Sequence, residues 1–182
     1  MRKILIALAL ALTVAAAAWA QTPDTPWTWQ LQAGYNNSTK WLDSGWNGST
    51  GIGYAFNDHL KLNFDVGYFQ GKIKHSDIKS HIWTFMLAPE YVASVTDNDQ
   101  LYGFVGVGVA RNDSKDSATG LPAPLDTVTI PGQSKFAAQV GIGYRHFFNQ
   151  NVGMSVQATY THMAFKEKLD PVDARVGMVV RF

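Results

Sequence analysis

The feature of this sequence that most restricts its fold is an alternation of apolar and polar residues that returns in segment after segment. In the first such segment the odd positions are Trp27, Trp29, Leu31, Ala33 and Tyr35. The even positions between them carry only Thr, Gln and Gly. A period of two puts the two kinds of side chain on opposite faces of a β-strand. The segment therefore predicts a strand with one apolar and one polar face.

Eight segments of the chain show this alternation. They are 27–36, 49–56, 60–68, 83–91, 101–109, 136–145, 152–161 and 172–182. The segment 101–109 is the least regular, because bulky residues occupy both of its faces. We expect an all-β protein with eight antiparallel strands that run up and down.

The connections between these segments alternate in length. Short turns at 57–58, 97–99 and 149–151 consist of Asn, Asp and Gln, and Asn and Asp favour tight turns. Longer links cover 37–46, 71–79, 112–134 and 165–171. Short turns at one end, long loops at the other and an even number of strands are typical of the β-barrels of bacterial outer membranes.

The first twenty residues look like a secretory signal peptide rather than a part of the fold. Arg2 and Lys3 precede an apolar run from Ile4 to Ala17, and small residues flank Trp19 at the end of the segment. We expect cleavage before Gln21, with 21–182 forming the barrel domain. The run is shorter than the ~20 residues that a membrane-spanning helix needs, and no later run reaches that length. A helical membrane protein is therefore excluded.

A soluble barrel that binds a ligand in its interior is the alternative to a membrane barrel, and the charged residues distinguish the two. A soluble barrel has its polar face outside, whereas a membrane barrel turns the apolar face to lipid. The charged strand residues Lys61, Asp65, Glu90, Lys135, Arg145, Asp173, Arg175 and Arg181 all share the face that also carries Gly, Ser, Thr and Gln. The apolar face carries almost no charge across the centres of the strands, as contact with lipid requires. Charged residues make up 16% of the chain and aromatic residues 13%.

The aromatic residues of the apolar face fall at two heights. Near the short turns lie Trp27, Phe56, Tyr91, Phe148 and Phe182, and near the long loops lie Tyr35, Trp46, Tyr68, Trp83, Phe136 and Tyr160. A general preference of aromatic residues for strands explains their number but not these two levels. Two aromatic girdles at the two membrane interfaces explain both.

Several kinds of site are excluded or disfavoured by the sequence. The chain has no Cys, and its 15 basic and 14 acidic residues provide no basic surface for a nucleic acid. Pairs such as Gly141 and Gly143 lack the third glycine and the helix of a dinucleotide site. The five His show no spacing typical of metal ligands. We expect no cofactor, no metal and no nucleic-acid partner.

The charged residues of the inward face form a candidate polar network. Its members are Lys61, Asp65, Glu90, Arg145, Arg175 and Arg181. They could line a narrow pore, but an eight-stranded interior is only wide enough for side chains, so we favour a plug of paired charges. Glu90 is placed to pair with several cations, and Asp65 is a candidate partner for Arg175.

The long links are the parts that such a barrel presents outside the cell. The link 71–79 is basic, with Lys72, Lys74 and Lys79. These lysines either form a solvated rim or contact the phosphate groups of lipopolysaccharide, and the sequence leaves both open. The longest link, 112–134, contains three Asp and three Pro. Exposed loops on a rigid scaffold are where recognition usually resides.

The chain resembles the small OmpA/OmpX-type outer-membrane β-barrel family over its whole mature length. The resemblance rests on the leader, the eight alternating strands, the glycine-rich segment 101–108 and the terminal segment 176–182 that ends in Phe182. It implies that Phe182 is the signal read by the outer-membrane assembly machinery. It also implies a location in the outer membrane of a Gram-negative bacterium, in contact with lipid and lipopolysaccharide.

The resemblance leads us to expect a monomeric, non-enzymatic barrel with a structural or surface-interaction role, such as adhesion to a host or contact with lipopolysaccharide. A lipid-modifying enzyme and a narrow channel are the alternatives. Some barrels of this size deacylate lipid A with a Ser two residues after a His on a late, lipid-facing strand position. His162 has this position, but residue 164 is Ala, so the nucleophile is missing.

Overall fold

The computed structural model describes residues 25–37, 43–72, 79–112, 133–165 and 170–182. Its strands, in chain order, are β1 (Trp27–Asn36), β2 (Gly45–Ala55), β3 (Leu60–Lys72), β4 (Lys79–Ser94), β5 (Asp99–Asn112), β6 (Gln133–Phe147), β7 (Val152–Met163) and β8 (Val172–Arg181). No helix within these ranges is long and apolar enough to cross a membrane. The predicted signal peptide falls outside the described residues.

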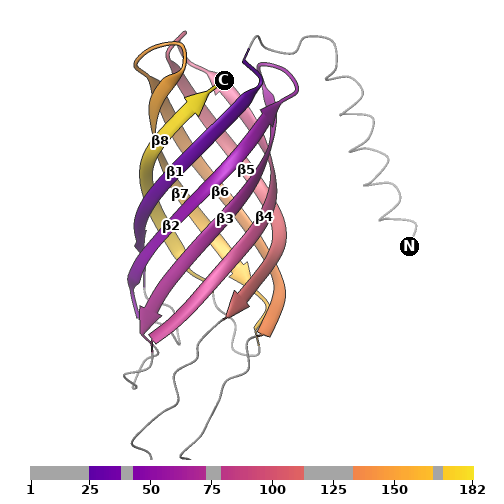
Figure 1. Ribbon diagram of the computed structural model, residues 1–182, viewed down its shortest axis with the longest axis vertical. Helices are drawn as coiled ribbons and strands as arrows, with labels where there is room; N and C mark the ends of the chain where they lie inside the picture. The colour runs from indigo at the N-terminus through magenta and orange to yellow at the C-terminus, as the bar shows by residue number, and fades with distance from the viewer. Residues whose placement is uncertain (1–24, 38–42, 73–78, 113–132, 166–169) are drawn as a thin grey trace, which may run out of the picture.

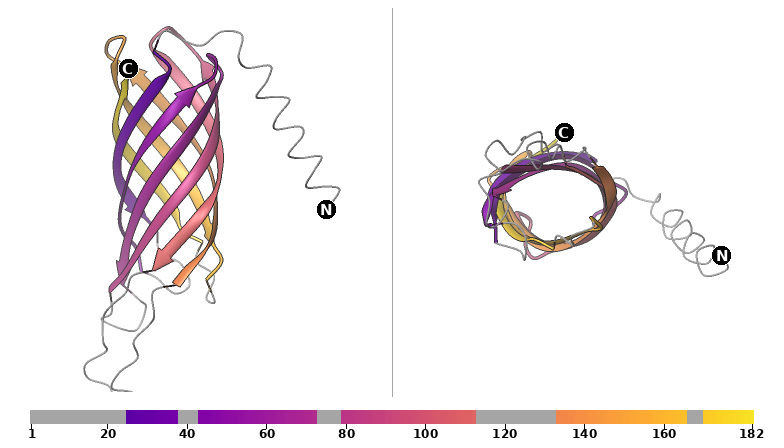
Figure 2. Two further views of the ribbon diagram at one scale, coloured as in Figure 1. Left: turned by 45° about the vertical axis from the view of Figure 1, so that its right-hand side comes forward. Right: turned by 90° about the horizontal axis from the view of Figure 1, so that it is seen from below.

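The eight strands close into a barrel. Each strand pairs antiparallel with the next, and β8 returns to pair with β1. Figure 1 shows the tilted strands, and the end view in Figure 2 shows them as a closed ring. At the seam the backbone N–H groups of Trp27 and Phe182 donate to each other's carbonyl oxygens at 3.1 and 3.0 Å. The predicted fold, an eight-stranded up-and-down antiparallel barrel, is confirmed.

The three short turns are stabilised by side-chain oxygens that accept hydrogen bonds from the backbone. Asn57 Oδ1 accepts from the N–H groups of His59 and Leu60 at 2.9 and 2.8 Å. Asn149 Oδ1 repeats this pattern two and three residues further along its own turn, at 2.9 and 2.8 Å. Thr96 Oγ1 accepts from the N–H of Asp99 at 3.1 Å. Local bonds of this kind are why Asn and Thr suit tight turns.

The strands extend further toward the long loops than the alternation indicates. Trp46, which the sequence places in a link, lies in β2, and β4 already begins at Lys79. The alternation marks only the part of each strand that faces lipid, because beyond the membrane a strand can pair without an apolar face. Residues 38–42, 73–78, 113–132 and 166–169 lie outside the described part of the chain.

The two faces of the barrel have the inverted polarity of a membrane protein. Leu31, Ile142 and Met178 are exposed on the outer face, with Ile142 reaching 69%. Gln32 and Ser155 are instead buried inside. Exposed apolar residues and buried polar ones fit lipid outside and a packed interior, as the sequence predicts.

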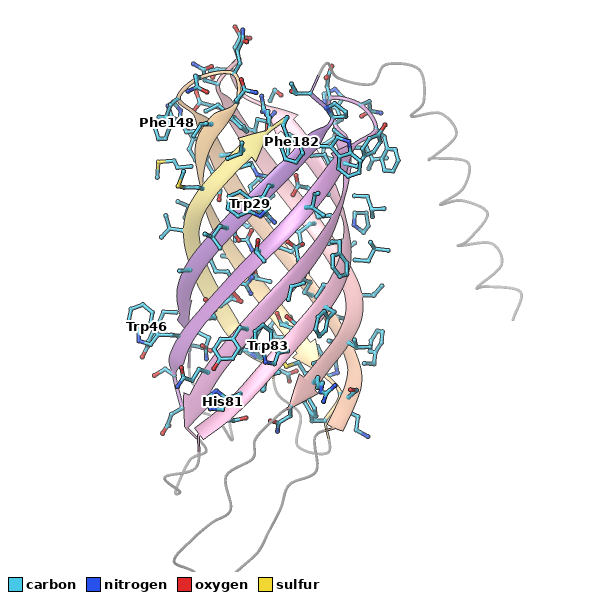
Figure 3. All side chains as sticks on the ribbon, viewed as in Figure 1. Trp29, Trp46, His81, Trp83, Phe148 and Phe182 are labelled. Carbon is cyan, nitrogen blue, oxygen red and sulfur yellow. The ribbon has the colours of Figure 1, made fainter. Side chains whose placement is uncertain are left out.

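The outward aromatic residues lie at the two ends of this apolar band. Figure 3 shows Phe148 and Phe182 near the short turns, and Trp46 and Trp83 toward the long loops. Trp46 and Trp83 pack edge-on or tilted against tyrosines of the neighbouring strands, with ring centroids 6.0 and 4.9 Å apart. Two levels of rings are the expected interfacial girdles.

A charge at the centre of the outer face should destabilise the barrel. Leu87 lies on β4 midway between Trp83 and Tyr91, so we expect Leu87→Arg to lower the free energy of unfolding in lipid by about 2–4 kcal/mol. Leu87→Met, which keeps the volume, should cost less than about 1.5 kcal/mol. Urea unfolding in phospholipid vesicles measures both. Equal stability of the Arg variant and the wild type would show that this face meets water.

Candidate functional site

The barrel interior holds the predicted charged network, and its centre is the ion pair between Arg145 of β6 and Glu90 of β4. The two Nη atoms of Arg145 donate to the two carboxylate oxygens of Glu90 at 2.5 and 2.7 Å. Asn63 adds a hydrogen bond to Glu90 Oε2 at 2.9 Å. The Tyr102 ring lies 3.8 Å from the guanidinium carbon of Arg145. Both charged side chains are buried, and the bidentate geometry offsets their loss of water.

Lys61 and Arg181 lie between this ion pair and the short turns. Lys61 is the direct neighbour of Glu90 across the β3–β4 ladder and is buried. The guanidinium carbon of Arg181 lies 3.4 Å from the centre of the Phe147 ring. Of the cations that the sequence places near Glu90, Arg145 is the one that forms its ion pair.

Arg175 has a different partner from the one suggested by the sequence. It pairs with Asp173, with Nε 2.5 Å from Oδ1, and its Nη2 donates to Oδ2 at 3.0 Å. Asp65, the candidate from the sequence, instead accepts a hydrogen bond from Gln30 at 2.8 Å. Residues two apart on a strand share a face, so Asp173 and Arg175 are brought together by β8 alone. The two-residue spacing of Asp173 and Arg175 is the feature of the sequence that indicates this ion pair.

Uncharged polar side chains link the charged groups across the interior. Gln32 Nε2 donates to Ser155 Oγ at 3.0 Å and to Gln157 Oε1 at 3.1 Å. Tyr102 donates its hydroxyl proton to the same Gln157 oxygen at 3.0 Å. Gly143 leaves the room for this, because a Cβ on it would collide with the Tyr102 ring. Inward glycines are thus packing positions, and the large rings beside them fill the barrel.

Near the long loops the interior is apolar on the side of β3 to β7, whereas buried Asn36, Asn47 and Asp173 lie on the side of β1, β2 and β8. A buried layer is formed by Phe69, Ile82, Met86, Ala110, Ala137 and Met163. The alternation of β4 and β6 places Met86 and Ala137 on the inward face, which the charged residues alone describe as polar.

In the polar middle of the barrel the described side chains leave little free space. This part encloses a cavity of only about 10 Å³, bordered by Asp65, Glu90 and Arg175 among others. A cavity of that size holds about one water molecule. Glu90 and Arg175 both border this cavity, and Arg175 lies beside Phe69 of the apolar layer.

On the outer face, His162 has an acidic partner but no nucleophile. Its Nδ1 lies 2.6 Å from Asp170 Oδ1, which is its one hydrogen-bond partner among the described residues. Position 164 is Ala, so no hydroxyl follows on the same face. A second pair joins His146 Nδ1 to Asp99 Oδ1 at 2.8 Å near the short turns. Nowhere in the described ranges do three or more His, Asp or Glu side chains gather as a metal site would require.

The remaining predicted residues lie at the two ends of the barrel. Phe182 is exposed on the lipid face beside the seam between β8 and β1. Lys72 and Lys79 are direct partners in the β3–β4 ladder at its long-loop end. Lys74 lies outside the described residues.

The pairing of Arg175 can be tested by combining substitutions. We expect Arg175→Leu to destabilise the barrel by about 3–5 kcal/mol, because it leaves the buried Asp173 carboxylate without a cation. Adding Asp173→Asn should restore most of this loss, whereas adding Asp65→Asn should not. Urea unfolding in vesicles of all three variants gives the comparison. Rescue by Asp65→Asn alone would make Asp65 the partner.

Comparison with known proteins places this geometry in a family. Residues 6–182 match the family described as "Outer membrane protein beta-barrel domain". No curated protein matches the sequence.

Solved structures share the fold at low sequence identity. Neisserial surface protein A superposes with a TM-score of 0.65 at 14% identity, covering 86% of this chain and 96% of the other. OprG from Pseudomonas aeruginosa gives 0.61 at 14% identity, with 87% and 97% covered. Ail from Yersinia pestis, in a phospholipid bilayer nanodisc, gives 0.51 at 16% identity, with 87% and 100% covered. The chain belongs to the outer-membrane protein β-barrel family and is a small eight-stranded barrel of the bacterial outer membrane.

Proposed function

We propose that this barrel is a non-enzymatic surface protein that acts through its long extracellular loops, with lipopolysaccharide as a contact. The observation that carries the proposal is the filled interior. Ion pairs, hydrogen-bonded amides and an apolar layer occupy the barrel, which leaves its extracellular end as the surface for recognition. A rigid scaffold that displays loops is a common arrangement for binding.

The outer surface supports a non-enzymatic role. The lipid-facing His162 pairs with Asp170, yet position 164 carries Ala where a nucleophilic Ser would be needed. A His–Asp pair alone orients an imidazole but supplies no group to attack an ester. The narrow channel is the second candidate, and the small size of the central cavity argues against it.

The channel alternative is tested by conductance. We expect the purified protein in planar bilayers to show no steady single-channel current, because the Arg145–Glu90 pair and the apolar layer close the cross-section. Replacing Phe69, Met86 and Met163 together with Gly should open the half of the interior near the long loops. The half with the charged pairs should stay closed, so this variant should also show no current. Steady wild-type current that is abolished by closing substitutions in the interior would establish a pore.

Two opposed lysines support lipopolysaccharide as the contact. Lys72 and Lys79 are paired in the β3–β4 ladder at the end of the barrel near the long loops. Lysine ammonium groups bind phosphate through charge-assisted hydrogen bonds. Lys74 lies in the segment that joins the two strands and would add a third cation.

Substituting these lysines should weaken binding of the lipid. We expect Lys72→Gln with Lys79→Gln to reduce the affinity of the barrel in nanodiscs for fluorescent lipid A by about tenfold or more, which corresponds to the loss of one or two charge-assisted hydrogen bonds. Lys135→Gln, on an exposed position near the same end, is the matched control and should leave affinity unchanged. An equal loss of affinity in the control would indicate a general effect of charge, and the lysines would then form only a solvated rim.

Two further parts of the proposal concern assembly and oligomeric state. Phe182 directly follows β8 and has an exposed aromatic ring, which fits a signal recognised by the outer-membrane assembly machinery. Because β1 and β8 pair with each other, the described strands leave no edge for a second chain, which fits a monomer.

A further inference from the structure

A pocket opens at the end of the barrel that carries the short turns, which is its periplasmic end. Its volume is about 300 Å³. Its wall combines the turn between β2 and β3 with inward residues of several strands: Thr25, Thr28, Ala55, Asn57, Asp58, His59, Lys61, Ser94, Gln100 and Arg181. This set is called the mouth pocket below. The ion pairs at the centre of the barrel do not neutralise the positive charge of this pocket.

Lys61 is the most unusual member of the mouth pocket. Only 6% of the residue is exposed, yet its ammonium group forms no ion pair or hydrogen bond with any described residue. The carboxylate beside it, Glu90, has both oxygens occupied by Arg145, and Asn63 adds a further bond. The ammonium group borders the mouth pocket, where water reaches it, and the carboxylate of its ladder neighbour Glu90 offsets part of its charge.

Arg181 brings a second cation to the same pocket. Its guanidinium stacks on the Phe147 ring at 3.4 Å, which holds the group in place while leaving its N–H donors free of a carboxylate. In the two buried ion pairs of the interior, Arg145 neutralises Glu90 and Arg175 neutralises Asp173. Asp65 borders the deeper cavity and not the mouth pocket, so Lys61 and Arg181 leave the pocket with an excess of positive charge.

Neutral polar groups complete the wall. Thr28, Ser94 and Gln100 border the pocket. The Thr28 hydroxyl donates to the carbonyl oxygen of Gly53 at 3.4 Å, and Gln100 Oε1 is a buried acceptor without a hydrogen-bond partner among the described residues. Asp58, the one acidic member, lies on the exposed turn, where water screens its charge. His59 is already engaged, because its Nδ1 lies 3.1 Å from the carbonyl oxygen of Val92.

We propose that the mouth pocket is a binding site for a small phosphate-bearing anion that enters from the periplasm. Lys61 supplies a compact charge, and Arg181 supplies paired N–H donors that match two oxygens of a tetrahedral anion. The Ser94 hydroxyl and the side-chain NH2 group of Gln100 are the neutral donors of the pocket for the remaining oxygens. A volume of about 300 Å³ accommodates a phosphate group with a small organic substituent.

Titration with inorganic phosphate tests the site directly. The mature protein in uncharged nanodiscs is titrated by calorimetry at low ionic strength, beside Lys61→Met, Lys61→Gln and Arg181→Gln. We expect each substitution to weaken binding by about ten- to hundredfold, as for the loss of a charge-assisted hydrogen bond. Lys135→Gln, a cation at the other end of the barrel, is the control and should bind like the wild type. Absence of saturable binding, or equal binding by all variants, overturns the proposal.

Two further measurements separate a phosphate site from a general cation cluster and from a structural lysine. Acetate should bind more weakly than phosphate, and equal affinity would overturn the assignment to a tetrahedral anion. Without phosphate, Lys61→Met should unfold at a higher temperature than the wild type, because it removes a largely buried ammonium group that Arg145 and Arg181 repel. Phosphate should raise the unfolding temperatures of the wild type and of Lys135→Gln by the same amount, and those of the Lys61 and Arg181 variants by less. A Lys61→Met barrel that is less stable than the wild type would make Lys61 a structural residue and overturn the proposal.

Discussion

The structure depends on one constraint, which is that every backbone N–H and C=O group within lipid must find a partner inside the protein. Pairing β8 with β1 meets this requirement, and the hydrogen bonds between Trp27 and Phe182 complete the ring. Closure in turn determines the interior. Eight strands enclose a space only as wide as the side chains that fill it, so every inward residue must fit against its neighbours and every inward charge must be compensated.

Much of the fold was predictable because the membrane imposes a simple rule on sequence. The alternation of residues such as Leu31 and Gln32 records which face meets lipid, and Asn57 and Asn149 mark turns by local bonds that need no knowledge of the rest of the chain. The ends of the strands were less predictable. Trp46 lies in β2 because pairing with β1 continues to Gly45, through Asn47 and Gly48, which interrupt the alternation in the sequence.

The interior was predictable in membership but not in pairing. The odd or even position of a residue in its strand shows whether the residue points inward. The partner of that residue depends on the tilt and register of strands that are distant in the sequence. Glu90 and Arg145 meet from β4 and β6, which are not neighbours in the ladder, so no local pattern could choose Arg145 over Lys61. The apolar layer around Phe69 and Met86 was hidden for another reason, since inward and polar were treated as the same property.

The interior changes in character from one end of the barrel to the other, and this order has consequences for function. The mouth pocket near the short turns carries Lys61 and Arg181, the Arg145–Glu90 pair occupies the middle, and the end near the loops combines the apolar layer with the Arg175–Asp173 pair. Removing one member of a buried pair leaves an uncompensated charge, so the middle tolerates little change. The two ends are held apart by this rigid centre. Substitutions in the loops and in the mouth pocket are therefore independent of each other, and their effects on stability should add.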